Sequence, residues 1–149
     1  MFWLLQLLIW LNFPNVKTIK ISQFIRWLDQ KASSIPLILD ARSQEEYALS
    51  HIKSAQWIEP SNSAIAAISG VPLNTPIVVY CSVGYRSAKV AQQLSSAGYQ
   101  NVFNLSGGIF QWANQGKLIF TDKHQVETVH PYNSIWGKLL KSKYHAHIK

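Results

Sequence analysis

The chain of 149 residues contains only one cysteine, Cys81. A single thiol excludes an intramolecular disulfide and a zinc site built from several cysteines. Such a chain suits a reducing compartment, where a free thiol persists, and we therefore expect a cytoplasmic protein. With 48% hydrophobic residues, the chain has enough apolar side chains for the core of one ordinary domain.

Acidic residues are also scarce, seven against fourteen lysines and arginines, which leaves a net charge of +7. After Gly116, six lysines are accompanied by only Asp122 and Glu127. Such an excess attracts small anions, anionic lipid or nucleic acid, or it only keeps the surface solvated. Neither an aromatic RNA-binding motif nor zinc-ligand spacing accompanies the charge, and we expect no nucleic acid partner and assign no metal site.

The sequence has no hydrophobic run long enough to cross a bilayer comfortably. Its N-terminal run contains Trp3, Trp10 and many leucines, and as a helix ending before Pro14 it would reach only about 20 Å. Three interpretations stay open. The run makes peripheral membrane contact through residues 1–14, it packs on the domain or on a partner, or it is upstream sequence without a function.

The rest of the chain alternates short apolar runs with helix-forming stretches. Ser22 is expected to cap one helix, and Ser43 with Glu46 forms a capping box for another. This alternation predicts an α/β fold, a parallel sheet flanked by helices on both faces. The expected strands cover 16–21, 36–39, 56–58, 77–80 and 102–105, and the expected helices cover 22–31, 61–69, 87–97 and 108–114, besides the one that begins after Ser43.

Cys81 follows the apolar run 77–80 and opens a polar loop that contains Gly84 and Arg86, directly before a helical stretch. This order places the thiol at the carboxyl end of a buried strand, where open α/β sheets bind their ligands. Loop N–H groups, the N-terminus of the following helix and the guanidinium of Arg86 all favour a thiolate. The alternative is a buried structural cysteine, which would not require a glycine and an arginine after it.

Three further motifs accompany this loop. Residues 37–47 contain an apolar strand that ends in Asp-x-Arg and leads to Glu-Tyr, residues 51–55 read His-Ile-x-x-Ala, and residues 107–112 read Gly-Gly-x-x-x-Trp. With the cysteine loop they resemble the single-domain rhodanese-like sulfurtransferase family over residues 18–118. Ser50 and Ser54 stand where that family usually has glycine.

The resemblance implies a rhodanese-like domain over 16–118, between an apolar N-terminal segment, 1–15, and a basic C-terminal extension, 119–149. The extension is expected to pack on the domain, with Ser134 capping a short helix through Lys141. The resemblance does not indicate an oligomeric state.

The resemblance also implies a sulfurtransferase that needs no cofactor and moves sulfane sulfur from a small anionic donor such as thiosulfate to cyanide or a thiol. Cys81 would carry the sulfur as a persulfide. The four residues between Cys81 and Arg86 are one fewer than in rhodanese-fold phosphatases, which argues against phosphate chemistry. A module that only binds or scaffolds a partner is the alternative. The expected persulfide- or substrate-binding loop consists of Ser82, Val83, Gly84, Tyr85, Arg86 and Ser87.

Four other side chain roles are expected. Arg86 either attracts an anionic donor or pairs with a carboxylate, and a mixed role is favoured. Asp40 and Arg42 support the site by bracing the loop or pairing with Glu46, and a structural role is favoured for both. His51 is expected to form a hydrogen bond at a helix end rather than to act as a base.

Overall fold

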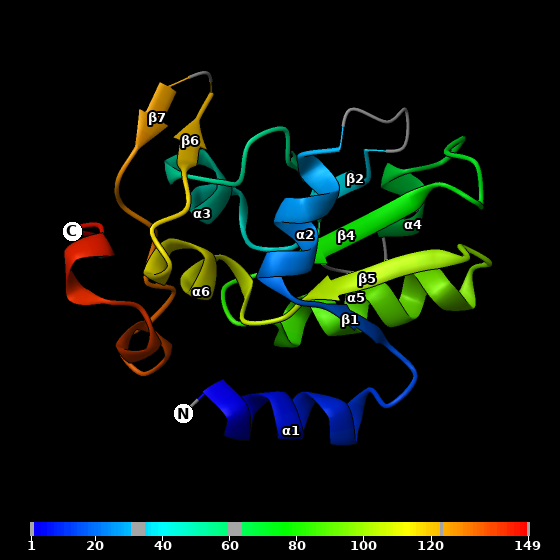
Figure 1. Ribbon diagram of the computed structural model, residues 1–149, viewed down its shortest axis with the longest axis horizontal. Helices are drawn as coiled ribbons and strands as arrows, with labels where there is room; N and C mark the ends of the chain where they lie inside the picture. The colour runs from blue at the N-terminus through cyan, green and yellow to red at the C-terminus, as the bar shows by residue number, and fades with distance from the viewer. Residues whose placement is uncertain (1, 31–34, 60–63, 123, 149) are drawn as a thin grey trace.

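A five-stranded parallel sheet organises the chain (Figure 1). The computed structural model describes residues 2–30, 35–59, 64–122 and 124–148. The strand order is β1-β5-β4-β2-β3, and every neighbouring pair in this sheet is parallel. The strands are β1 (Lys17–Ile19), β2 (Leu37–Asp40), β3 (Gln56–Trp57), β4 (Pro76–Tyr80) and β5 (Asn101–Leu105).

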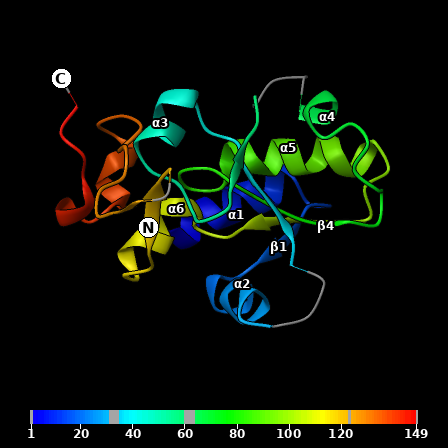
Figure 2. The same cartoon turned by 90° about the horizontal axis from the view of Figure 1, so that it is seen from above.

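Helices cover both faces of the sheet, as the alternating sequence predicts (Figure 2). The central strand β4 is apolar throughout and its side chains enter two separate core clusters. Val78 and Tyr80 join a cluster with the helices α2 (Ile21–Leu28) and α6 (Gly108–Asn114). Ile77 and Val79 join a cluster with the helices α4 (Ala64–Ala67) and α5 (Tyr85–Ser96). A strand buried on both faces requires such a continuous apolar run.

The helices begin close to their expected positions. They are α1 (Phe2–Asn12), α2 (Ile21–Leu28), α3 (Gln44–Leu49), α4 (Ala64–Ala67), α5 (Tyr85–Ser96) and α6 (Gly108–Asn114). The predicted Ser43–Glu46 capping box is confirmed at α3, with Ser43 Oγ accepting the Glu46 N–H and Glu46 Oε1 accepting the Ser43 N–H. The start predicted for α4 at Ser61 lies outside the described residues.

One predicted cap is wrong. Ser22 lies inside α2, whose N-cap is Lys20. The Lys20 N–H donates to Gln23 Oε1 at 3.0 Å, and the helix ends at Leu28 rather than near Lys31. The helix begins at Ile21, before the predicted cap, because burying the Ile21 side chain in the core outweighs the preference for a serine cap.

The N-terminal segment forms the expected helix and packs on the domain. Leu5 and Ile9 of α1 are buried in the core cluster that contains Val78, while most other apolar residues of α1 are exposed. Within the described residues, none of the helices has the length and hydrophobicity that crossing a membrane requires. Figure 1 shows α1 lying beneath β1 and α5.

The C-terminal segment also packs on the domain. It contains an antiparallel hairpin, β6 (Ile119–Thr121) and β7 (His124–Val126), and two short 3-10 helices, η1 (Trp136–Leu139) and η2 (Ser142–Tyr144). Phe120 pairs with His51 through two backbone hydrogen bonds. The helix predicted from Ser134 to Lys141 is only a 3-10 turn, and Asn133 caps it, because its Oδ1 accepts the N–H groups of Ile135 and Trp136.

Candidate active site

Cys81 lies directly after β4, at the carboxyl edge of the sheet, with 1% of its surface exposed. The loop after it curves back so that the Gly84 N–H donates to Cys81 Sγ at 3.1 Å. This curvature places Gly84 at a φ of +111°, which L side chains rarely adopt. Gly84 therefore provides the backbone conformation that the curvature of the loop requires.

Ser87, in the first turn of α5, provides a second polar contact to the thiol. Its Oγ lies 3.3 Å from Cys81 Sγ and 2.6 Å from Asn104 Oδ1. Asn104 Nδ2 donates to the Gly84 carbonyl at 2.9 Å, which orients the amide so that its oxygen faces Ser87. A hydroxyl has one proton, so Ser87 donates either to Asn104 or to a thiolate at Cys81.

Arg86 forms a bidentate ion pair with Glu46, each guanidinium–carboxylate contact measuring 2.9 Å. Ser82 Oγ joins the pair, donating to Glu46 Oε2 and accepting from Arg86 Nη2. Burial opposes ionisation of Glu46, but the hydrogen bonds and charge of Arg86, together with Arg42 and the Ser43 N–H, lower the pKa of Glu46 to about 2. Glu46 therefore anchors the loop as a carboxylate.

The arginine is held in its charged form as well. Burial alone would lower the pKa of Arg86, yet the Glu46 carboxylate and the charge of a Cys81 thiolate raise it. The sequence leaves open whether Arg86 binds a donor or a carboxylate. The structure shows the carboxylate pair.

Asp40 and Arg42 form a fully buried pair, with Arg42 Nη2 at 2.6 Å from Asp40 Oδ2. The same nitrogen donates to the Ser50 carbonyl, and Tyr80 donates its hydroxyl to Asp40 Oδ2. Burial and the Asp40 charge raise the pKa of Tyr80 well above its ordinary value, so the hydroxyl remains a donor. The pair ties the ends of β2, β4 and α3 together, which agrees with the structural role favoured from the sequence.

His51 forms the expected hydrogen bond at a helix end, because its Nδ1 lies 2.9 Å from the Tyr47 carbonyl of α3. Its ring also stacks on the ring of Tyr47 at a centroid distance of 4.0 Å. Both contacts are structural.

The glycine pair at the start of α6 allows the backbone of that helix to form hydrogen bonds with the cysteine loop. The Ile109 and Phe110 N–H groups donate to the carbonyls of Cys81 and Ser82 at 2.9 and 3.0 Å. A Cβ at Gly108 would lie 2.5 Å from both carbonyl oxygens. Only glycine permits so close an approach of two backbones.

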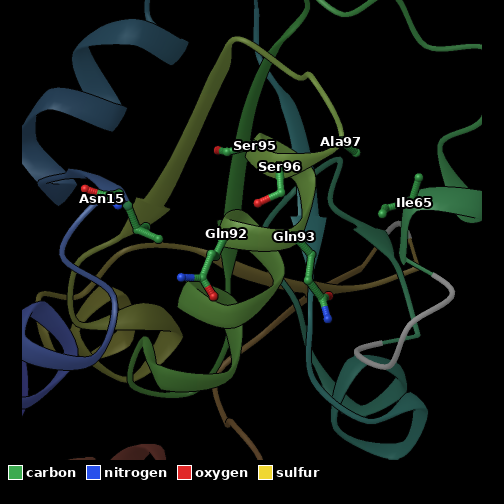
Figure 3. A pocket seen from close by; sticks show the side chains of 8 residues that line it. Asn15, Ile65, Gln92, Gln93, Ser95, Ser96 and Ala97 are labelled. Carbon is green, nitrogen blue, oxygen red and sulfur yellow. The ribbon is translucent and has the colours of Figure 1, made fainter.

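A cavity of about 100 Å³ adjoins the thiol. It is lined by Cys81, Ser82, Val83, Tyr85, Arg86, Tyr132 and Trp136. A larger open hollow, of about 700 Å³, lies toward the other end of α5 (Figure 3). Among the described residues that line that hollow, none has an ionisable side chain, whereas the cavity at Cys81 is lined by a thiol and a guanidinium group.

The predicted loop residues are thus gathered around one thiol, but four neighbours escape prediction. Glu46 is expected as a helix cap or as a partner of Asp40 and Arg42, but it pairs with Arg86, whereas Arg42 pairs with Asp40. Asn104 is expected only as part of a strand, although its place near the end of β5 is a signal that polar side chains gather at that edge. Tyr132 and Trp136 reach the cavity from the extension. Nothing in their local sequence indicates this contact.

The arrangement suits a nucleophilic thiolate that receives a small group. N–H and O–H donors face the sulfur, a cation lies beside it, and the loop that carries them is fixed from the sheet and from α6. Such preorganised donors stabilise negative charge without the cost of reorienting.

Comparisons with known proteins agree with this geometry. The family model described as "Rhodanese-like domain" matches residues 21–115. Over 95 residues the chain is 32% identical to "Thiosulfate sulfurtransferase GlpE" from Pseudomonas fluorescens, a match that covers 61% of this chain and 86% of that protein. A crystal structure of a rhodanese-like domain protein from Staphylococcus aureus has a TM-score of 0.58 at 27% identity and covers 65% of this chain and 91% of its own.

Another relative is much longer than the match. The chain is 34% identical over 91 residues to "Probable adenylyltransferase/sulfurtransferase MoeZ" from Mycobacterium tuberculosis, but spans only 22% of its length.

Proposed function

The chain belongs to the rhodanese-like domain family, and from this we propose that it is a sulfurtransferase that carries sulfane sulfur on Cys81. The donor is a small anion such as thiosulfate, and the acceptor is cyanide or a thiol. The name of the Pseudomonas relative supports this donor class.

In the first half of the reaction the Cys81 thiolate attacks the outer sulfur of thiosulfate. A new sulfur–sulfur bond forms at Cys81, the bond within thiosulfate breaks, and sulfite leaves with the electron pair. The Gly84 N–H and the Ser87 hydroxyl, which lie at Cys81 Sγ, stabilise the thiolate before the attack. Ser87 turns its proton from Asn104 to the sulfur in this state.

In the second half the acceptor attacks the outer sulfur of the persulfide. Cyanide leaves as thiocyanate, and the electron pair of the breaking bond returns to Cys81 as the thiolate. No proton transfer is needed with cyanide, so this step requires no general base. Arg86 lies at the cavity wall, and its charge draws anions toward the thiol while Glu46 keeps it in place.

One observation carries the proposal: the only thiol of the chain receives the Gly84 N–H beside a small cavity. Intact-protein mass spectrometry after brief exposure to thiosulfate tests it, with Cys81→Ser as the control. We expect a gain of one sulfur atom that cyanide removes and that the variant lacks. If several sulfane donors add no sulfur to the folded protein, the chain is a binding module instead.

We also propose that α1 contacts the surface of an anionic membrane. Trp3 and Trp10 are 68% and 60% exposed, and four leucines of the helix are exposed with them. An apolar groove between α1 and η1 is bordered by Lys138. The sequence has no acidic residue before Asp29 and none after Glu127, so the two segments that form this face repel no lipid phosphate.

Flotation with vesicles tests this contact. We expect binding to phosphatidylglycerol vesicles, little binding to phosphatidylcholine vesicles, and loss of binding when Trp3 and Trp10 are both changed to alanine. Leu73→Ala, an equally apolar truncation at another exposed position, serves as the control. Equal flotation of both variants, or none by the natural chain, would dismiss the contact.

A further inference from the structure

Two aromatic side chains from outside the matched domain line the cavity at Cys81. Tyr132 and Trp136 lie in the C-terminal extension, whereas the family match ends at residue 115. The other lining residues come from the Cys81 loop and the first turn of α5. The approach to the thiol is therefore completed by a segment that is not part of the family domain.

Tyr132 is held in place by several contacts. Its ring centroid lies 4.2 Å from Cζ of Arg86, the same arginine that Glu46 fixes. Its φ is +68°, a left-handed conformation that is unfavourable for a bulky residue. Its N–H donates to Nδ1 of His130 at 3.0 Å. A strained residue at the rim of a site is maintained by its surroundings, and the ring of this one lines the cavity.

Trp136 begins η1, which is capped from within the extension and bonded to the domain through α6. Asn133 Oδ1 accepts the Trp136 N–H at 2.8 Å. Asn114 of α6 donates to the Leu139 carbonyl and accepts the Lys141 N–H, both at 2.8 Å. These bonds hold the turn that carries Trp136 against the domain.

The space that these walls leave is small. A cavity of about 100 Å³ is well below the roughly 300–1,000 Å³ of ordinary ligand pockets. We propose that Tyr132 and Trp136 set a size limit at Cys81 and make the chain selective for small inorganic sulfane-sulfur donors over aryl or peptide-borne ones. The choice of sulfur donors rests on the proposed function, whereas the size limit does not.

Two thiol reagents with the same reacting group and leaving group, one small and one bulky, test the limit. The Cys81 thiolate attacks the sulfenyl sulfur of methyl or benzyl methanethiosulfonate, a mixed disulfide forms, and methanesulfinate leaves in both cases. Because the chain has one cysteine, the modification occurs at one site. The ratio of the two rate constants is compared with the same ratio for free glutathione, which corrects for intrinsic reactivity.

We expect the natural chain to favour the methyl reagent, relative to glutathione, by about tenfold or more, and Tyr132→Ala to remove most of that preference. Tyr132 is partly exposed, so this variant should fold, and its circular dichroism checks that it does. Tyr132→Phe keeps the ring and should keep the ratio. Ile135→Ala, a truncation of a 70% exposed neighbour that does not line the cavity, should keep it too.

The outcomes separate the two proposals. A natural chain that shows the ratio of glutathione, or a folded Tyr132→Ala variant that keeps the preference, overturns the size limit. Selective modification without any sulfur uptake from thiosulfate would leave the size limit standing and refute the sulfurtransferase. If both hold, the same variant should raise kcat/KM for benzenethiosulfonate relative to thiosulfate.

Discussion

Glu46→Gln is the substitution that most directly tests how the active loop is held. Glutamine keeps an oxygen for the Ser43 capping box, removes the charge that faces Arg86, and replaces the oxygen that accepts from Ser82 and Arg86 by an NH2 group. The pKa of Glu46 falls from its ordinary value of 4.5 to about 2 in the folded protein. A folded-state pKa below the unfolded one means that the carboxylate stabilises the fold above the unfolded pKa, and that this contribution is lost as pH falls.

The size of the effect follows from that shift. At pH 7 the ionised Glu46 contributes about 3 kcal/mol to the free energy of unfolding, and at pH 3 only about 1 kcal/mol remains. We therefore expect the stability difference between the natural chain and Glu46→Gln to shrink by roughly half or more between these two pH values. Other carboxylates titrate in both proteins and cancel in the difference.

Urea unfolding measured at several pH values provides the assay, because urea adds no salt that would screen the pair. Glu45→Gln is the matched control, since Glu45 is the preceding residue of α3 and is exposed. Its stability difference from the natural chain should be small at every pH. A Glu46→Gln difference that is near zero, or that does not change between pH 7 and pH 3, would refute the anchoring role of the ion pair.

Three further substitutions test other parts of the site. Gly108→Ala should lower the free energy of unfolding by roughly 3 kcal/mol or more, because it adds a backbone clash to an unfavourable φ. Gly116 also has an unfavourable φ but has open space around it, so Gly116→Ala should lower the free energy of unfolding by only about 1 kcal/mol. Equal losses of unfolding free energy in the two variants, measured by urea unfolding, would contradict the close backbone contact between α6 and the cysteine loop. Ser54→Gly should raise stability by up to about 1 kcal/mol, because Ser54 has a φ of +67°, and an unchanged melt would argue against strain there. Ser87→Ala should slow sulfur uptake from thiosulfate by about tenfold, because one hydrogen bond to a charged group is lost. Rapid-quench mass spectrometry measures this rate, and an unchanged rate would mean that the Ser87 hydroxyl donates to Asn104 alone.

The cysteine loop is the part of the site that the sequence predicts best. Strand, loop and helix follow one another directly, so the position of Cys81 can be predicted from neighbouring residues, although Glu46, Asn104 and α6 hold the loop from distant parts of the chain. The same holds for the parallel sheet, because each apolar run is short and bounded by polar or glycine residues. Local order is enough wherever the interacting groups are close in the chain.

Long-range partners are less predictable from the sequence. The sequence shows Glu46 beside Ser43, and the capping box that it predicts is confirmed, but the same carboxylate also pairs with Arg86 from a distant loop.

The structure shows how the chain accommodates its two departures from the family pattern, Ser50 and Ser54. Ser54 adopts the left-handed φ that glycine would adopt freely, whereas Ser50 is extended and presents its carbonyl to Arg42, so a side chain is tolerated there.

The extension combines two roles that a deletion could not separate. Val129 and Leu140 are buried in the same core cluster as Val78 of the central strand, so removing the extension would expose the core as well as the cavity. Tyr132, in contrast, contacts Arg86 from the rim and is partly exposed. Because stability resides in the buried aliphatic residues and access to the thiol depends on the aromatic rim, single substitutions at Tyr132 can change what reaches Cys81 without unfolding the domain that activates it.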